Sequence, residues 1–425
     1  MSELLRRLVV CDTSNPPGRE TAAAAILEEY VSAAGLECRR VVKDPDRANL
    51  LVRLPGRGTG PSLGFLGHLD VVVARREDWS VEPFGAVERD GAIWGRGTVD
   101  MKCQVAATAV ALAILAREGF QPAGDVMLLL MADEEDGGAG VGSPFFVEQM
   151  PDLSLDFVIG EGAGERYALP SGPVYLMDHG VKATASATLT VPGRAGDASL
   201  PDAGENAVFA MARLLSRLGE YRAPVHIPAE VVALIDAAAP GPGRPQQRLA
   251  AARAAHPGLD RVLGALVGTT IQPTIVAVPE PQNVVPPQAT VTLSCIVLPG
   301  TSTADLEQEL RDALGPGDYT LEIVAPKGGS VSDTETVLHH AIESCLAARD
   351  PAARLVPVLG YGYSDCHVIR EAYGAITYGF IPFRHADPVV NLETKHGVDE
   401  RVLIDDLIFQ TEMALAITRT IGDTP

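Results

Sequence analysis

The sequence predicts an α/β fold with a smaller α+β domain inserted into it, and three observations support this prediction. Short apolar segments alternate with amphipathic helical segments over 21–160, which indicates a mixed sheet flanked by helices. The pattern changes at residue 182, and helical periodicity resumes near residue 335. A chain of 425 residues with 46% hydrophobic content also exceeds the usual size of one domain. We therefore expect a discontinuous larger domain of residues 1–181 and 327–425 around an inserted domain of residues 182–326.

Glycines delimit the expected elements of the larger domain. Gly35 and Gly119 each follow an amphipathic segment, and glycine is common just past the end of a helix. The expected elements are a helix at 21–34, strands at 49–54 and 63–66, a helix at 104–118, and strands at 126–131 and 156–160. In such sheets the site lies at the strand ends, so polar residues that follow the strands are expected to meet there.

The inserted domain has its own pattern of strands and helices. Its expected elements are strands at 183–191, 290–298 and 319–324, helices at 205–218 and 303–314, and an Ala/Pro/Arg-rich helical insertion at 228–266. This order fits a βαββαβ sandwich. A helix at 335–348 then begins the second portion of the larger domain.

Charge and composition exclude several classes of partner. The net charge is -21 and no cluster of Lys and Arg compensates it locally, so we expect no nucleic-acid partner. No apolar run reaches membrane-spanning length, and the first residues lack the apolar core of a signal peptide. The six cysteines have no paired short spacing, which favours reduced thiols. We therefore expect a cytoplasmic protein that has no membrane partner.

Histidine and acidic residues follow two of the expected strands. His68 and Asp70 come just after one apolar run and, two residues apart, share one face. We expect Asp70 to accept a hydrogen bond from one ring nitrogen of His68, which leaves the other to bind a metal. Glu134 and Glu135 follow another apolar run, and adjacent carboxylates repel unless a cation or a proton relieves them. Together these residues favour metal-assisted hydrolysis.

Five segments are similar to those of a known family. They are 67–71 (GHLDV), Trp79 with Pro83 and Phe84, 90–102 (DGAIWGRGTVDMK), 133–135 (DEE) and 396–400 (HGVDE). With these segments the chain resembles the M20 family of metallopeptidases and amidohydrolases, which includes carboxypeptidases, aminoacylases, deacetylases, desuccinylases and dipeptidases. The resemblance implies a zinc-peptidase-like catalytic domain with an inserted ferredoxin-like lid that forms a homodimer, and a small peptide or N-acyl amino acid as substrate.

The same resemblance implies a role for each residue of a two-metal site. His68 and Glu161 would be terminal ligands of one ion, Glu135 and His396 of the other, and Asp100 the bridge. Carboxylates and imidazoles suit zinc, with cobalt or manganese as alternatives. Glu134 would be the general base that takes a proton from water and delivers it to the leaving nitrogen. The family pattern also implies a cis peptide bond between Asp100 and Met101.

Three residues resemble family positions that line or close the substrate pocket. Ser364 and Asp365 end a glycine-rich segment that lines the pocket in the family, although Asp365 equally suits the N-cap of a following helix. Asn283 resembles a lid asparagine that orients substrate, although an asparagine there also suits a simple turn.

Two lid positions depart from the family pattern. Asp197 stands where relatives carry a histidine that stabilises the tetrahedral oxyanion, and a carboxylate cannot donate that hydrogen bond unless it is protonated. Ile296 stands where relatives carry an arginine that tends to recognise a substrate carboxylate. Arg194, Arg370 and Arg384 are candidate replacements for that arginine, and His385 is one for the oxyanion donor.

Three hypotheses therefore remain open. The first is a dinuclear-metal amidohydrolase that acts on a small peptide or N-acyl amino acid. The second is a transacylase or condensing enzyme of specialised metabolism that uses the same metal site. The third is a homologue whose hydrolysis is impaired by Asp197 and Ile296 and which is retained for binding or assembly.

Overall fold

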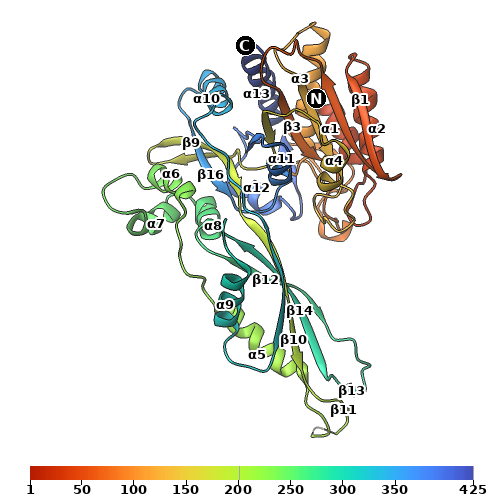
Figure 1. Ribbon diagram of the computed structural model, residues 1–425, viewed down its shortest axis with the longest axis vertical. Helices are drawn as coiled ribbons and strands as arrows, with labels where there is room; N and C mark the ends of the chain where they lie inside the picture. Colours follow the sequence, from red (N-terminus) through yellow and green to blue (C-terminus); the bar gives the residue numbers. More distant parts are fainter. Residues whose placement is uncertain (201, 425) are drawn as a thin grey trace.

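A mixed sheet of nine strands organises the larger part of the computed structural model, which describes residues 1–200 and 202–424 (Figure 1). Its strand order is β1 (Glu37–Asp44), β2 (Arg47–Leu54), β6 (Val126–Met131), β3 (Leu63–His68), β7 (Phe157–Gly160), β17 (Ile376–Gly379), β9 (Gly172–Val181) and β16 (Arg354–Gly360), and β8 (Arg166–Leu169) pairs with β9. Strand β3 runs parallel to both β6 and β7. Their carboxyl ends therefore lie at one edge of the sheet, where the expected site residues begin.

Helices cover both faces of this sheet. They are α1 (Ser2–Val10), α2 (Glu20–Ser32), α3 (Lys102–Arg117), α4 (Ser143–Gln149), α10 (Val337–Arg349), α11 (Cys366–Tyr373), α12 (Pro388–Thr394) and α13 (Ile404–Gly422). Alternate residues of β6 divide between two buried clusters: Leu128 packs with α3 and α13, whereas Leu129 packs with α4 and α11. This division follows from the period of two in a strand that is buried on both faces.

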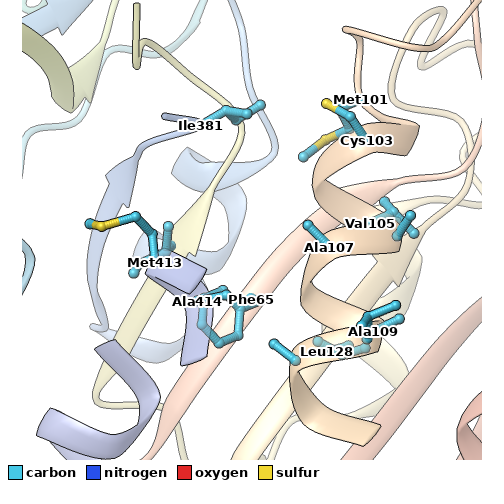
Figure 2. Close-up of a cluster of buried hydrophobic side chains, with 14 of the residues drawn as sticks. Phe65, Met101, Cys103, Val105, Ala107, Ala109, Leu128, Ile381, Met413 and Ala414 are labelled. Atoms are coloured by element: carbon cyan, nitrogen blue, oxygen red, sulfur yellow. The ribbon is translucent and has the colours of Figure 1, made fainter. Parts of the chain in front are cut away.

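Helix α3 is buried along most of its length, and its alanines allow close packing. Figure 2 shows Ala107 of this helix directed toward Phe65 of β3 and toward Met413 and Ala414 of α13, which lie across from it. Small side chains bring a helix close to its neighbours, and buried apolar area stabilises the fold by about 25 cal/mol per Å². The helix begins two residues after Asp100, so this packing fixes the position of that aspartate.

The segment expected to form the lid, which is called the lid below, contains a four-stranded antiparallel sheet with two helices. The sheet order is β12 (Thr270–Ala277), β14 (Gln288–Val297), β10 (Ala183–Pro192) and β15 (Thr320–Gly328), and the helices are α5 (Ala207–Glu220) and α9 (Thr303–Leu314). The chain order is βαββαβ, which agrees with the predicted ferredoxin-like arrangement. A pair of short strands, β11 (Gly196–Asp197) and β13 (Val284–Val285), forms a tip at the end of the lid far from the main sheet (Figure 1).

Three helices form the predicted helical insertion between α5 and β12. They are α6 (Ala229–Ala238), α7 (Pro245–Ala254) and α8 (Pro257–Leu266). Their apolar residues, such as Leu234 and Leu263, pack in one cluster with Val358 of β16 and Val174 of β9. The insertion therefore rests against the edge of the main sheet, which places α8 close to the site.

The remaining elements are small. A three-stranded sheet joins β18 (Arg401–Leu403), β5 (Ala92–Trp94) and β4 (Val87–Arg89), and a short 3₁₀ helix spans Arg76–Asp78. The peptide bond between Asp100 and Met101 is cis, as predicted. Within the described ranges, every helix is too short or too polar to cross a membrane.

Candidate active site

His68 is the last residue of β3, and its buried ring lies between two aspartates. Its Nε2 is 3.1 Å from Oδ1 of Asp100, and its Nδ1 is 3.0 Å from the main-chain oxygen of Asp70. The carboxylate of Asp70, which we expected to accept from this ring, lies farther away, at 3.6 Å. The main-chain carbonyl of Asp70 therefore orients the ring and leaves Nε2 directed at Asp100.

The carboxylate of Asp70 has another role, because it fixes the turn that carries the two glutamates. It accepts hydrogen bonds from the main-chain N–H of Glu134 at 3.2 Å and of Glu135 at 3.0 Å, and from the side chain of Asn15 at 2.9 Å. Asp70 is fully buried. It is a positioning residue, and Asn15 is a supporting residue that sequence reasoning missed.

Asp100 lies between two imidazoles, one on each carboxylate oxygen. Oδ1 faces Nε2 of His68 at 3.1 Å, and Oδ2 faces Nε2 of His396 at 3.1 Å. Oδ2 is also 3.3 Å from Nζ of Lys395. A buried carboxylate with this arrangement can bind two cations at once, one on each oxygen.

Glu135 and Glu161 complete the two sides of this arrangement. Oε2 of Glu135 is 3.0 Å from Nε2 of His396, and Oε2 of Glu161 is 3.9 Å from Nε2 of His68. Ligand atoms around a tetrahedral zinc are about 3.3 Å apart when the metal–ligand bonds are about 2.0–2.1 Å. The distances around Asp100 are therefore of the size that such ions require.

His68, Asp100, Glu135, Glu161 and His396 together form what is called the acidic cluster below. Glu134 is close to this cluster but does not pair with either imidazole. Burial raises its pKa well above the usual value, and the nearby charge of Glu161 raises it further. It belongs to a group with His68 and Glu161 whose ligand atoms all lie within 4.8 Å of one another, and His68, Asp100 and Glu135 form a second such group. Four carboxylates thus face one small volume that needs positive charge.

Two observations indicate that metal ions fit this site. Oε1 of Glu135 is buried and has no hydrogen-bond partner among the described residues, which is costly for a carboxylate oxygen. The pKa of His396 is raised to about 10 despite burial, because Asp100 and Glu135 attract a cation to that position. Oxygen and imidazole ligands without cysteine suit zinc, cobalt or manganese.

Glu400 and Arg96 hold the loop that delivers Asp100. Glu400 is fully buried and accepts hydrogen bonds from the main-chain N–H of Val99 at 2.6 Å and of Asp100 at 3.0 Å, and from Arg96 at 2.5 Å. The loop and Glu400 are 300 residues apart in sequence. Both residues lie in the segments that carry the family resemblance, but only the structure reveals what they do.

A cavity of 470 Å³ opens onto the cluster. It is lined by Asp100, Glu134, Glu135, Glu161, Arg261, Val262, Ala265, Tyr361, Gly362, Tyr363, Leu392, Lys395 and His396. Arg261 and Lys395 are the cationic side chains of this lining besides His396, and neither was singled out from the sequence. Arg261 comes from α8 of the helical insertion, where composition alone gives no sign of a site.

The glycine-rich segment also lies at the site. Tyr361 and Tyr363 line the cavity, whereas Ser364 and Asp365 are buried and are not part of its lining, and Ser364 lines a small adjoining cavity instead. Asp365 precedes α11 without capping it and accepts hydrogen bonds from Ser143 and Tyr363. Burial raises the pKa of Asp365 to about 7. Neither residue is among those that line this cavity.

The structure does not bring Asn283 and Asp197 to the cluster of acidic and histidine side chains of their own chain. Both are exposed at the tip of the lid, where the main chain of Ala198 donates to the main-chain oxygen of Asn283 at 3.1 Å. The carboxylate of Asp197 accepts from the main chain of Ser199 at 2.9 Å and from its hydroxyl at 2.7 Å. Ile296 lies on the face of β14 opposite to the buried core of the lid.

The arginines and the histidine that we considered as replacements are also outside the cavity. Arg370 is buried and bound to Ser332 and Thr377, and the guanidinium of Arg384 donates to the main chain of Arg349. Arg194 donates to the main chain of Ala203 in the lid, and His385 is exposed away from the lining. Of the arginines, Arg261 is the one that lines the cavity in the described part of the chain.

Comparisons of this chain with known proteins agree on one family. Residues 64–420 match the sequence profile described as Peptidase family M20/M25/M40. The chain is 34% identical over 221 residues to the succinyl-diaminopimelate desuccinylase of Cereibacter sphaeroides, a match that covers 50% of this chain and 55% of the relative. It is 35% identical over 233 residues to that of Rhodospirillum rubrum, which covers 51% and 56%. The chain thus spans little more than half the length of the curated relatives it matches.

Solved structures share the fold over nearly the whole chain. An M20 family metallo-carboxypeptidase from Sulfolobus solfataricus has a TM-score of 0.72 at 18% identity and covers 98% of both chains. Human carnosine dipeptidase 1 has a TM-score of 0.72 at 15% identity, with 99% of this chain and 96% of that chain covered. At these identities the likeness concerns the fold.

Proposed function

Since the chain belongs to peptidase family M20/M25/M40, we propose that it is a hydrolase that cleaves an amide bond of a small peptide or N-acyl amino acid with two divalent metal ions. The observation that carries this proposal is the position of Asp100, whose two carboxylate oxygens each face one imidazole at 3.1 Å. That arrangement supports one ion on each side of a shared carboxylate.

Each side of Asp100 has two further ligands in this proposal. His68 and Glu161 would hold one ion, and Glu135 and His396 would hold the other, with zinc the first choice and cobalt or manganese the alternatives. Such ions would supply Lewis acidity toward the amide carbonyl and lower the pKa of the attacking water. Asp70 keeps the turn of Glu134 and Glu135 in place, and its backbone carbonyl keeps the ring of His68 oriented.

Glu134 is the general base of this reaction. Its carboxylate takes a proton from the attacking water and gives it to the leaving nitrogen, which are the two proton transfers of amide hydrolysis. Its position in the cavity lining and its freedom from imidazole contacts support this role. A pKa raised by burial makes the carboxylate of Glu134 a stronger acceptor for the proton of the attacking water.

The cavity suits a small substrate with an apolar part and a negative charge. Val262, Ala265 and Leu392 provide an apolar wall, and Arg261 lines the same cavity. Arg261 is held by Glu393 at 2.6 Å, which leaves other N–H groups of the guanidinium able to bind a carboxylate. Desuccinylases are named for an acyl group that itself carries a carboxylate, and such substrates should be tested first.

Residues 182–326 act as a lid in this proposal, and two copies of the lid form a homodimer. The edge strand β12 is consistent with pairing, because its Ile275 is 60% and its Val276 61% exposed. An unpaired edge strand with exposed apolar residues is a common place for association between chains. Closure of the lid over the cavity would exclude water from the reaction.

The proposed function is tested by metal-dependent hydrolysis. Purified protein should be loaded with zinc, cobalt or manganese and offered N-succinyl amino acids, N-acetyl amino acids and dipeptides. We expect release of free amine, which a chelator abolishes and added metal restores. No hydrolysis by protein that holds two ions would contradict the proposal, and amide products formed only with added amine acceptors would favour acyl transfer.

Replacing Arg261 with methionine should raise KM for substrates with a free carboxylate about 10-fold and leave kcat nearly unchanged, since a hydrogen bond to a charged group contributes about 1.5 kcal/mol. The measurement compares each acid with its methyl ester, whose KM should not change. Arg194→Met is the matched control in the lid. A rise in KM for Arg194→Met alone would instead place recognition of the carboxylate at the lid tip.

A further inference from the structure

Lys395 places an ammonium group inside the acidic cluster, and the proposed function gives it no role. Its Nζ is 2.7 Å from Oε1 of Glu161 and 3.3 Å from Oδ2 of Asp100. The side chain is 30% exposed, so it reaches inward from the loop after α12 rather than extending into solvent. Lys395 directly precedes His396, which faces the other side of the cluster.

This ammonium makes the two sides of Asp100 unequal. On one side, Glu161 has Lys395 on Oε1 and directs Oε2 toward His68 at 3.9 Å. On the other side, Glu135 has His396 on Oε2 at 3.0 Å, while its Oε1 is buried without a partner among the described residues. The shorter contact of the ammonium is thus with Glu161, on the side of His68, and its longer contact is with Oδ2 of Asp100, the oxygen that faces His396. The side of His396 in addition has an acceptor oxygen to spare.

We propose that Lys395 competes with a metal ion for Asp100 and Glu161, so that the two metal positions differ in affinity and the one beside His68 is the weaker. This inference rests on the two-metal site of the proposed function. An ammonium repels a divalent ion that shares its carboxylate ligands, and burial reduces the screening of that repulsion. The second ion can then bind only if the ammonium moves away, or it binds more weakly because the ammonium stays nearby.

The charge of Lys395 decides the direction of the effect of a substitution. Residues that hold a metal ligand from outside typically change metal affinity by about 10- to 100-fold. A neutral or negative residue that contacts a metal ligand increases the affinity for the metal ion, whereas a positive residue in that place repels the ion. Removal of the charge should therefore tighten the weaker position by at least about 10-fold, although it also removes a hydrogen bond that orients Glu161.

The experiment measures metal binding rather than activity. Full-length wild type, Lys395→Met, Lys395→Arg and Lys327→Met are stripped by chelation and titrated with Zn²⁺ by calorimetry. Metal content is then measured after gel filtration. Lys327 is an exposed lysine of β15, so it is a matched control for the same change far from the cluster. Lys395→Gln answers the same question if thermal melting shows that the methionine variant does not fold.

We expect wild type, Lys395→Arg and Lys327→Met to keep one ion tightly and to bind a second at least about 10-fold more weakly, and Lys395→Met to bind the second more tightly. Two wild-type ions of equal affinity, or a second ion that is unchanged or weaker in Lys395→Met, would overturn this inference while leaving the two-metal enzyme intact. Failure of every variant to bind any ion would overturn the proposed function as well.

Discussion

Replacing Glu134 with glutamine should lower the rate of amide hydrolysis by about 100- to 10,000-fold, which is the usual contribution of a positioned general base. The amide has nearly the same shape as the carboxylate but cannot accept the proton of the attacking water. Metal binding should persist, because Glu134 makes no contact with either imidazole and the main chain of its turn is held by Asp70. The measurements are kcat for the best substrate and the metal content of the purified variant.

Glu135→Gln is the matched control, because it makes the same change one residue later. Oε2 of Glu135 is 3.0 Å from Nε2 of His396, so loss of this carboxylate should weaken metal binding. The two variants should therefore have different defects. Glu134→Gln should keep its metal ions and hydrolyse more slowly, whereas Glu135→Gln should lose a metal ion. If Glu134→Gln lost metal and kept its rate per bound ion, Glu134 would be a ligand rather than the base.

Replacing Asp197 with histidine should raise hydrolysis by about 100- to 1000-fold, which is the usual value of one oxyanion donor. In a single chain the lid tip with β11 and β13 lies far from the main sheet, whose strand ends carry the cluster (Figure 1), so the imidazole can act only at the cavity of a second chain. The gain should therefore depend on protein concentration and fall on dilution below the concentration at which dimers form. Initial rates over a dilution series, with sedimentation at the same concentrations, measure both effects.

Asp202→His controls for an added imidazole in the same loop and should leave the rate unchanged. No gain from Asp197→His in a protein that is dimeric would mean that the reaction does not need a donor from the lid. That result would favour acyl transfer, or a chain retained for a function other than hydrolysis, since Ile296 also stands where the family resemblance implies an arginine that recognises substrate.

Much of the fold follows from local pattern, and the exceptions have physical causes. The strand expected at 126–131 is β6, and the helical insertion expected at 228–266 contains α6, α7 and α8. Strands β9 and β12 were missed. Strand β9 carries the buried polar residues Asp178 and His179, and β12 is an exposed edge strand with Pro273 beside an irregularity in its register. Neither has the alternation by which a strand is recognised in sequence.

The residues of the site also fall into two groups: those that the sequence predicts and those that only the structure reveals. His68 and Glu161 were expected at strand ends, and β3 and β7 place them there because parallel strands end at one edge of a sheet. The family assignment is confirmed by the match over residues 64–420, whereas the ligand roles remain a proposal. Arg261, Lys395 and Glu400 act through neighbours that are distant in sequence, which no local pattern reveals. The sequence of the lid tip likewise does not show whether its residues act at the cavity of their own chain or at that of a second chain.

Every side chain of the acidic cluster comes from outside residues 182–326, whereas Arg261, Val262 and Ala265 of the cavity wall come from within them. In the proposed function, the groups that cleave the bond and part of the surface that selects the substrate therefore lie in different stretches of the sequence. Mutations in the lid can be sampled by evolution without loss of the reactive centre, and grafting a relative's lid onto this chain is a practical route to new selectivity.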